Sequence, residues 1–181
     1  MKLVYLADIR FPIERANGIQ AIETCHALAR RGVEVELVVQ RTDARTDEEC
    51  LAYFGLESHP KLRLRRVRAP GFLSLAAPLM LASEASDVLL TRDLILAGLA
   101  TKLADAALVY EAHTVAAVFA EERGRMYEAG ALPTPRKLAR LDAGEKRVFK
   151  NATSMVSISR IVERLSIDAL TVRLGSPTQS H

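Results

Sequence analysis

The amino-acid sequence predicts an α/β fold with a doubly wound, mostly parallel, Rossmann-like sheet. Short apolar runs rich in β-forming residues alternate with amphipathic segments of helical period along the whole chain. The connections are short, which forces successive strands to run parallel with helices on both faces. The chain has 181 residues, of which 49% are hydrophobic, enough for one domain with a sizeable core. A sheet of about six or seven strands is expected.

The first strand and helix are predicted before residue 33. LVYLA at 3–7 has the continuous apolar pattern of a strand that is buried on both faces. A polar loop over 8–18 follows and precedes a helix. Asn17 is the expected N-cap of this helix, and Gly32 is the residue expected after its end. The apolar face of the helix carries Ile19, Ile22, Cys25, Leu28 and Ala29.

Two further strands and a short helix are predicted up to residue 67. VEVELVV at 33–39 is a second buried strand. Thr46 and Glu49 have the spacing of a capping box, which opens a short helix that ends near Gly55. The alternating LRLRRV at 62–67 is typical of an edge strand.

The second part of the chain continues the alternation. Thr134 as a cap, followed by Pro135 at the first helical position, is a strong signal for a helix start. Helices are predicted at 72–83, 94–104, 134–151 and 160–165, and strands at 87–91, 107–111, 154–159 and 170–174.

The composition excludes several classes of protein. Cys25 and Cys50 lie far apart, without a CxxC spacing, so neither a disulfide framework nor a zinc site is expected. This use of cysteine is typical of a reducing compartment, and we expect a cytoplasmic protein. No apolar stretch reaches the roughly 20 residues of a spanning helix. The net charge of +3 comes from interspersed acids and bases, and no nucleic-acid partner is expected.

Several familiar site motifs of α/β proteins are absent. The sequence has no GxGxxG after its first strand, no GxxxxGK[ST], no GxSxG and no HExxH. These absences count against an NAD-type enzyme, a P-loop protein, an α/β-hydrolase and a metalloprotease. We expect no metal and no other cofactor.

Polar residues follow the predicted strand at 107–111. In a doubly wound sheet, ligands bind outside the carboxyl ends of the strands, which makes Glu111 and His113 of VYEAHT candidate site residues. The helix start at Asn17 and Gly18 offers unpaired N–H groups and a positive dipole end, which suit a phosphate or sugar hydroxyl groups. Taken alone, Asn-Gly before a helix is a weak signal.

Four pieces of sequence occur together in a fixed order: RANGIQAIETCHALARRGVEVELVV, DVLLTRD, LVYEAHT and EKRVFKNATSMVSIS. Each piece is similar to a segment of one known family of proteins. The first is similar to that family's first loop, first helix and second strand, and the second to its strand that ends in Tyr/Thr-Arg-Asp. The third is similar to its strand end of the form ExH, and the fourth to its helix that leads into a strand ending in serine. In this order, over almost the whole chain, they resemble the N-terminal domain of GT-B fold, family 4 (group 1) glycosyltransferases.

The resemblance implies a function and a domain organisation. It implies a retaining transfer of a sugar from an activated donor, usually a nucleotide sugar, to a sugar or lipid-linked acceptor. It also implies a second Rossmann-like domain with an ExxxxxxxE motif that binds most of the donor. Residues 1–175 would form the N-terminal, acceptor-side domain, and 176–181 the start of a linker or tail. Residues 1–181 alone are then expected to have negligible transferase activity and an open cleft, part of which a homo-oligomer could cover.

Two other functions stay open at this point. The same fold could be a non-enzymatic domain that binds a sugar or a protein partner. A hydrolase that uses Glu111 and His113 ranks last, because the sequence shows no nucleophile motif.

The resemblance also implies roles for single residues, beginning with two catalytic candidates. His113 would hydrogen-bond the donor sugar, and we favour this role over a histidine that merely caps the next turn. Glu111 would orient a hydroxyl or hold His113, and the alternative of an ordinary strand-end acid stays open.

The substrate-binding candidates are Asn17, Gly18, Arg92 and Ser159. The family has a double glycine where this chain has Asn17 and Gly18. Arg92 could bind a phosphate or an acidic acceptor, or it could pair with Asp93 or Glu111. Ser159 could line the cleft or cap the next helix.

A basic run precedes the apolar segment at 72–83 and consists of Lys61, Arg63, Arg65, Arg66 and Arg68. Contact with a membrane surface is conceivable there. We favour the alternative, an edge strand protected by charge and followed by a core helix.

Overall fold

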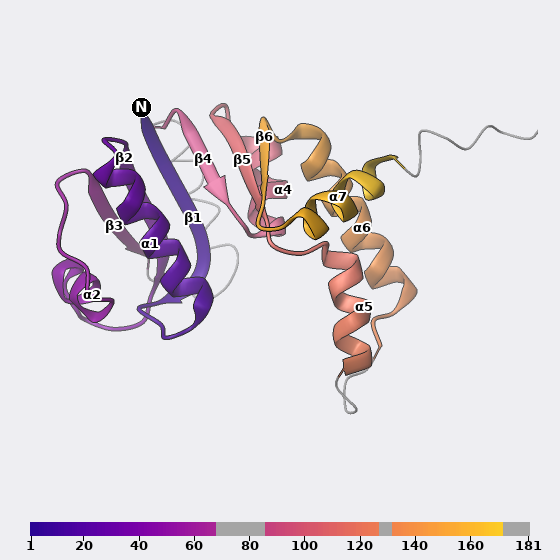
Figure 1. The fold of residues 1–181 in the computed structure, drawn as a ribbon, viewed down its shortest axis with the longest axis horizontal. Coiled ribbons are helices and arrows are strands. Elements are labelled where there is room, and N and C mark those ends of the chain that lie inside the picture. The colour runs from indigo at the N-terminus through magenta and orange to yellow at the C-terminus, as the bar shows by residue number, and fades with distance from the viewer. Residues whose placement is uncertain (68–85, 127–131, 172–181) are drawn as a thin grey trace, which may run out of the picture.

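The computed structural model describes residues 1–67, 86–126 and 132–171 of the chain. They form one sheet of six parallel strands in the order β3-β2-β1-β4-β5-β6 (Figure 1). The strand order reverses between β1 and β4, and the helices lie on both faces. This arrangement confirms the predicted doubly wound α/β fold.

The strands are β1 (Lys2–Phe11), β2 (Glu34–Arg41), β3 (Leu62–Val67), β4 (Val88–Thr91), β5 (Ala107–Ala112) and β6 (Ser154–Ser157). The helices are α1 (Ala16–Arg30), α2 (Asp47–Tyr53), α4 (Leu94–Leu103), α5 (Ala116–Met126), α6 (Pro135–Asn151) and α7 (Arg160–Thr171).

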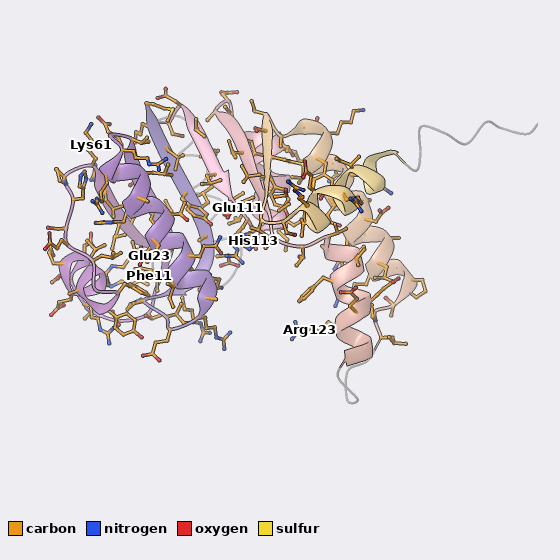
Figure 2. The ribbon with its side chains drawn as sticks, in the orientation of Figure 1. Phe11, Glu23, Lys61, Glu111, His113 and Arg123 are labelled. Atoms are coloured by element: carbon orange, nitrogen blue, oxygen red, sulfur yellow. The ribbon has the colours of Figure 1, made fainter. Side chains whose placement is uncertain are left out.

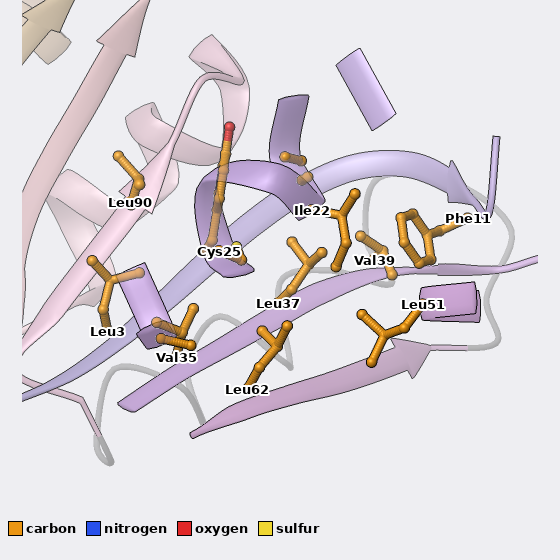
Figure 3. Close-up of a cluster of buried hydrophobic side chains, with 14 of the residues drawn as sticks. Leu3, Phe11, Ile22, Cys25, Val35, Leu37, Val39, Leu51, Leu62 and Leu90 are labelled. Carbon is orange, nitrogen blue, oxygen red and sulfur yellow. The ribbon is translucent and has the colours of Figure 1, made fainter. Parts of the chain in front are cut away.

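Each face of the sheet has its own hydrophobic cluster, because successive strand residues point to opposite faces. Leu3 and Tyr5 of β1 pack with Ile22 and Cys25 of α1 on one face (Figure 3). Val4 of β1 and its neighbour Leu6 belong to the cluster on the other face, together with residues of α4 and α6. The central strands are therefore buried on both sides, as their continuous apolar runs predict.

The local helix signals are largely confirmed. Thr46 and Glu49 form both bonds of a capping box at the start of α2. Thr134 caps α6 by accepting a hydrogen bond from the backbone of Lys137 at 3.3 Å, and Pro135 is the first helical residue. Gly32 has a φ of +94° just after α1, a conformation that glycine adopts without steric cost.

The start of α1 differs from the prediction. The strand β1 continues to Phe11, and α1 begins at Ala16 with Arg15 as its N-cap, so Asn17 is not the cap. The side-chain oxygen of Asn17 instead accepts a hydrogen bond from the backbone N–H of Gly18 at 3.0 Å. The first turn therefore begins closer to the strand than the N-cap preference of asparagine suggested.

The end of the described chain also differs. A strand was expected at 170–174, but Leu170 and Thr171 belong to α7, so the prediction is wrong for these two residues. Val162 and Ser166 are buried one turn apart on this helix, which is the spacing of a helical face. Residues 172–174 and the predicted helix at 72–83 lie outside the described residues. No element was predicted at the position of α5.

Arg63, Arg65 and Arg66 of the basic run lie on an edge strand, as expected; Lys61 directly precedes the strand, and Arg68 lies outside the described residues. β3 is the outermost strand beside β2. Nε of Arg65 donates to Oε1 of Glu36 on β2 at 2.7 Å, and Nε of Arg66 donates to Oδ1 of Asp47 on α2 at 3.1 Å. These arginines hold the edge to its neighbours. Among the described residues, no helix is both long enough and apolar enough to cross a membrane.

Candidate functional site

The candidate site lies where β5 ends. Glu111 is paired in register with Val156 of β6 and points to the same face of the sheet as α1, whereas its neighbours Tyr110 and Ala112 belong to the cluster on the opposite face. His113 follows directly after the strand. Figure 2 shows the two side chains next to each other, and Nε2 of His113 lies 3.0 Å from Oε1 of Glu111. The side chains are 16% and 12% exposed, so the pair is largely screened but still reachable from solvent.

Groups from three other elements converge on this pair. The hydroxyl of Tyr5 on β1 donates to Oε2 of Glu111 at 3.0 Å. Nε2 of Gln20 on α1 donates to Oε1 of Glu111 at 3.0 Å and lies 3.3 Å from Nε2 of His113. Arg92, directly after β4, donates from its guanidinium to Oε1 of Gln20 at 3.1 Å. The network therefore joins β1, α1, β4 and β5 at the carboxyl ends of the central strands.

Burial keeps the neutral groups of this network protonated. Burial, followed by the charge of Glu111, raises the pKa of the Tyr5 phenol well above its usual range. The same two causes raise the pKa of the Cys25 thiol. Tyr5 is thus a hydrogen-bond donor to the carboxylate. Cys25, which is fully buried, packs as a small apolar residue and lacks the thiolate that a nucleophile needs.

The N-terminus of α1 faces the same end of the sheet. Its first turn contains no acidic residue, and its N-cap residue, Arg15, makes no side-chain capping hydrogen bond. In the described part of the chain, the backbone N–H groups of Ala16 and Asn17 donate to no protein acceptor. Unpaired amides at the positive end of a helix suit an anion or hydroxyl groups.

Gly18 in that turn is required by packing. A Cβ atom there would lie 2.6 Å from Cγ2 and 2.9 Å from the backbone oxygen of Ile13. Gly18 is buried, and its absent side chain lets the preceding loop approach α1 closely. The close contact of Gly18 is therefore with Ile13 of the same chain.

The structure shows which protein contacts Arg92 and Ser159 make. Arg92 donates to Gln20 and forms no ion pair with Asp93 or Glu111 within the described residues. Asp93 caps α4 by accepting from Ile95 and Leu96 at 2.9 Å. The hydroxyl of Ser159 accepts from the backbone of Val162 at 3.2 Å and so caps α7. Substrate binding by Arg92 and by Ser159 stays a prediction.

Three residues that form or support the site were not identified from the sequence. Tyr5 lies within an apolar run, and Gln20 is one polar residue of an amphipathic helix, so neither has a local signature. Glu145 of α6 is 2% exposed, and its carboxylate accepts hydrogen bonds from the backbone N–H groups of Ala116 and Ala117. It holds the start of α5, three residues after His113.

Comparisons with known proteins were made for the family, the sequence and the fold. The family model described as Glycosyltransferase Family 4 matches residues 18–173. The search of curated proteins found no match. Among solved structures, sucrose-phosphate synthase from Thermosynechococcus elongatus is 15% identical with a TM-score of 0.56. This match covers 85% of the present chain and 41% of that chain.

A second structural match is a short-chain dehydrogenase/reductase from Burkholderia vietnamiensis. It is 15% identical with a TM-score of 0.43, and it covers 99% of the present chain and 97% of that chain.

The family match spans most of the chain and includes Gln20 of α1 and the strand end that carries His113. The similarity to sucrose-phosphate synthase agrees with it in fold. The chain belongs to Glycosyltransferase Family 4.

Proposed function

We propose that this chain is the N-terminal, acceptor-side domain of a retaining glycosyltransferase that uses a nucleotide-sugar donor. Residues 1–175 would form this domain, and 176–181 would begin the connection to a further domain. The observation that carries the proposal is the convergence of His113, Glu111 and Arg92 with α1 at the carboxyl ends of the parallel strands.

The chemistry of sugar transfer fits these groups. When the bond between the anomeric carbon and the diphosphate breaks, negative charge develops on the diphosphate, and a catalyst has to stabilise it. The unpaired amides of the first turn of α1 and the guanidinium of Arg92 are donors of the required kind.

His113 and Glu111 have complementary properties toward a sugar. A neutral imidazole can donate and accept hydrogen bonds, as a sugar hydroxyl does. Both oxygens of Glu111 already accept hydrogen bonds from protein groups, so its role would be to fix the imidazole rather than to take a proton. His113 would then be the residue that contacts the sugar.

A second domain would complete the site. The chain spans 41% of the sucrose-phosphate synthase chain that it matches. We infer that the rest of the donor site lies outside these residues, so that residues 1–181 alone would bind a ligand weakly. Transfer by them would be negligible, because one wall can neither exclude water nor hold both reactants.

The test is a transfer assay with a panel of nucleotide sugars on the protein that carries this chain and on residues 1–181 alone. The proposal predicts a product whose anomeric configuration, read by NMR, equals that of the donor, and no measurable turnover by residues 1–181. Inverted product would contradict the retaining mechanism, and rapid turnover by residues 1–181 would contradict the division into two domains. Sugar binding without turnover in either form would favour the non-enzymatic alternative.

A further inference from the structure

Gln20 occupies the centre of the hydrogen-bond network at the end of β5. Its side-chain oxygen accepts from Arg92 at 3.1 Å, and its side-chain nitrogen donates to Glu111 at 3.0 Å. The same nitrogen lies 3.3 Å from Nε2 of His113. One amide thus contacts three of the residues to which the proposed function assigns roles.

The orientation of this amide is fixed by the chemistry of its neighbours. A guanidinium has only donors, so the oxygen of Gln20 has to face Arg92. An ionised carboxylate has only acceptors, so the nitrogen has to face Glu111. A flipped amide would place N–H against N–H and oxygen against oxygen, and both contacts would be lost.

The proton on His113 follows from the same contacts. Nε2 of His113 lies 3.0 Å from Oε1 of Glu111, and this short contact is favourable when Nε2 carries a proton. The alternative, in which a bare Nε2 accepts from Gln20 at 3.3 Å, would place two acceptors 3.0 Å apart. The bond that Nε2–H donates to the charged carboxylate is stronger than the bond that a bare Nε2 would accept from the neutral amide of Gln20, so the proton lies on Nε2. In the neutral ring, Nδ1 is then the bare acceptor.

We propose that Gln20 is a positioning residue that links Arg92 to Glu111. It holds Oε1 of Glu111 where that oxygen accepts from Nε2 of His113, and this contact fixes the tautomer and orientation of the imidazole. Gln20 lies on α1, one turn after the unpaired amides at the helix start. The helix α1 would thus offer its unpaired amides to an anion. Through Gln20, it would also set which ring nitrogen of His113 faces the sugar. The catalytic purpose of this contact rests on the proposed function, but its test requires no substrate.

The test is nitrogen-15 NMR of the histidine rings, which reports directly which ring nitrogen carries the proton. The chain contains four histidines, His26, His59, His113 and His181, so assignment is simple. The spectra are recorded at a pH where the rings are neutral. In the unmodified chain, His113 should show a protonated Nε2 and a bare Nδ1.

Two substitutions separate the contacts of Gln20. Gln20→Met keeps the length of the side chain but removes every hydrogen bond. Gln20→Glu keeps an acceptor for Arg92 but places a carboxylate against Glu111. Gln20→Met should shift the His113 nitrogens toward an average of the two tautomers. Gln20→Glu places a further acceptor near Nε2 of His113 and should leave the proton there. Both should leave the ring nitrogens of His26 and His59 unchanged. Ala27→Met, at an exposed position on the same helix, is the control and should change nothing at His113.

A His113 that keeps its tautomer in Gln20→Met, with the fold intact by circular dichroism, would overturn the inference. A bare Nε2 in the unmodified chain would also overturn it. Neither result depends on a substrate, so the inference can fail while the proposed function stands. If the protein that carries this chain transfers sugar, Gln20→Met should lower kcat more than it raises KM, as expected for a group that orients a catalytic residue.

Discussion

At the scale of residues, several part-buried polar side chains converge on one carboxylate, that of Glu111. Oε2 of Glu111 accepts a hydrogen bond from Tyr5. Oε1 accepts one from Gln20 and lies 3.0 Å from Nε2 of His113. Burying a polar group costs free energy unless the group is hydrogen-bonded. These contacts therefore explain how Glu111 and His113 are stable at the end of a central strand. The residue types of VYEAHT were visible in the sequence, but Tyr5 is 106 positions from Glu111, and no local pattern connects them.

The first prediction concerns His113. If its ring contacts the donor sugar, His113→Ala in the protein that carries this chain should lower kcat/KM by roughly 10- to 1000-fold, the range for one or two lost stabilising contacts. Steady-state kinetics with the best donor of the panel measure this effect. His26→Ala, on the outward side of α1 where His26 meets Glu57, is the matched control and should leave kcat/KM unchanged. Unchanged kinetics in His113→Ala would mean that the residue is structural only.

The second prediction concerns Gly18 in α1 and Gly98 in α4. Gly18→Ala would force a methyl group against the backbone of Ile13 and should lower the free energy of unfolding by about 1–3 kcal/mol. Gly98→Ala is the control, because a Cβ there meets nothing within 4 Å, and it should stabilise the chain by up to about 1 kcal/mol. Urea unfolding measures both values. Equal effects would show that the close approach at Gly18 is not tight.

At the scale of elements, the helix ends show what local sequence can predict. The starts of α2 and α6 and the end of α1 were predicted correctly, because their signals lie within four residues of each other. The start of α1 was predicted wrongly, because it depends on the length of β1 and on the contact between Gly18 and Ile13. The helix α5 was missed, since one of its anchors, Glu145, is 28 residues or more away.

The third prediction concerns this anchor. Burial raises the pKa of Glu145 above its usual range, although the amides of Ala116 and Ala117 act in the opposite direction. A carboxyl whose pKa is raised on folding stabilises the fold fully below its unfolded pKa, about 4.3, and this contribution is lost as the pH rises through the folded pKa. The free energy of unfolding of the unmodified chain, minus that of Glu145→Gln, should therefore fall as the pH rises from about 4.

Urea unfolding at a series of pH values measures this difference. Lys146→Gln, one residue along α6, leaves Glu145 intact and is the control for a changed charge. A difference that rises with pH would show that the hydrogen bonds to α5 outweigh burial.

At the scale of the whole molecule, the sheet order brings the site together. Alternating strands and helices predicted the parallel sheet, and the topology predicted that ligands bind at its carboxyl edge. The order β3-β2-β1-β4-β5-β6 places β1 beside β4 and β4 beside β5, which is why groups from these three strands meet. The positions of Glu111 and His113 therefore followed from the sequence. The network around them did not, because it depends on how α1 packs across β1.

The fourth prediction concerns the core on which this packing depends. Leu89 is fully buried in β4 at the centre of the sheet, and Leu89→Ala should lower the free energy of unfolding by about 2–5 kcal/mol. Ile95 is 59% exposed, and Ile95→Ala should change it by less than about 0.5 kcal/mol. Thermal and urea unfolding measure both, and similar losses would argue against a shared core under β4.

The most direct test of the account is to map where a nucleotide sugar binds. The amide and histidine NMR signals of residues 1–181 are followed as nucleotide sugars are added at millimolar concentration. We predict shifts at the backbone amides of Ala16 and Asn17, at the side-chain amide of Gln20 and at the ring of His113, with His26 and His59 unchanged. Shifts confined to other parts of the chain, or no shift with any donor of the panel, would contradict the assignment of this strand end as the sugar-binding site.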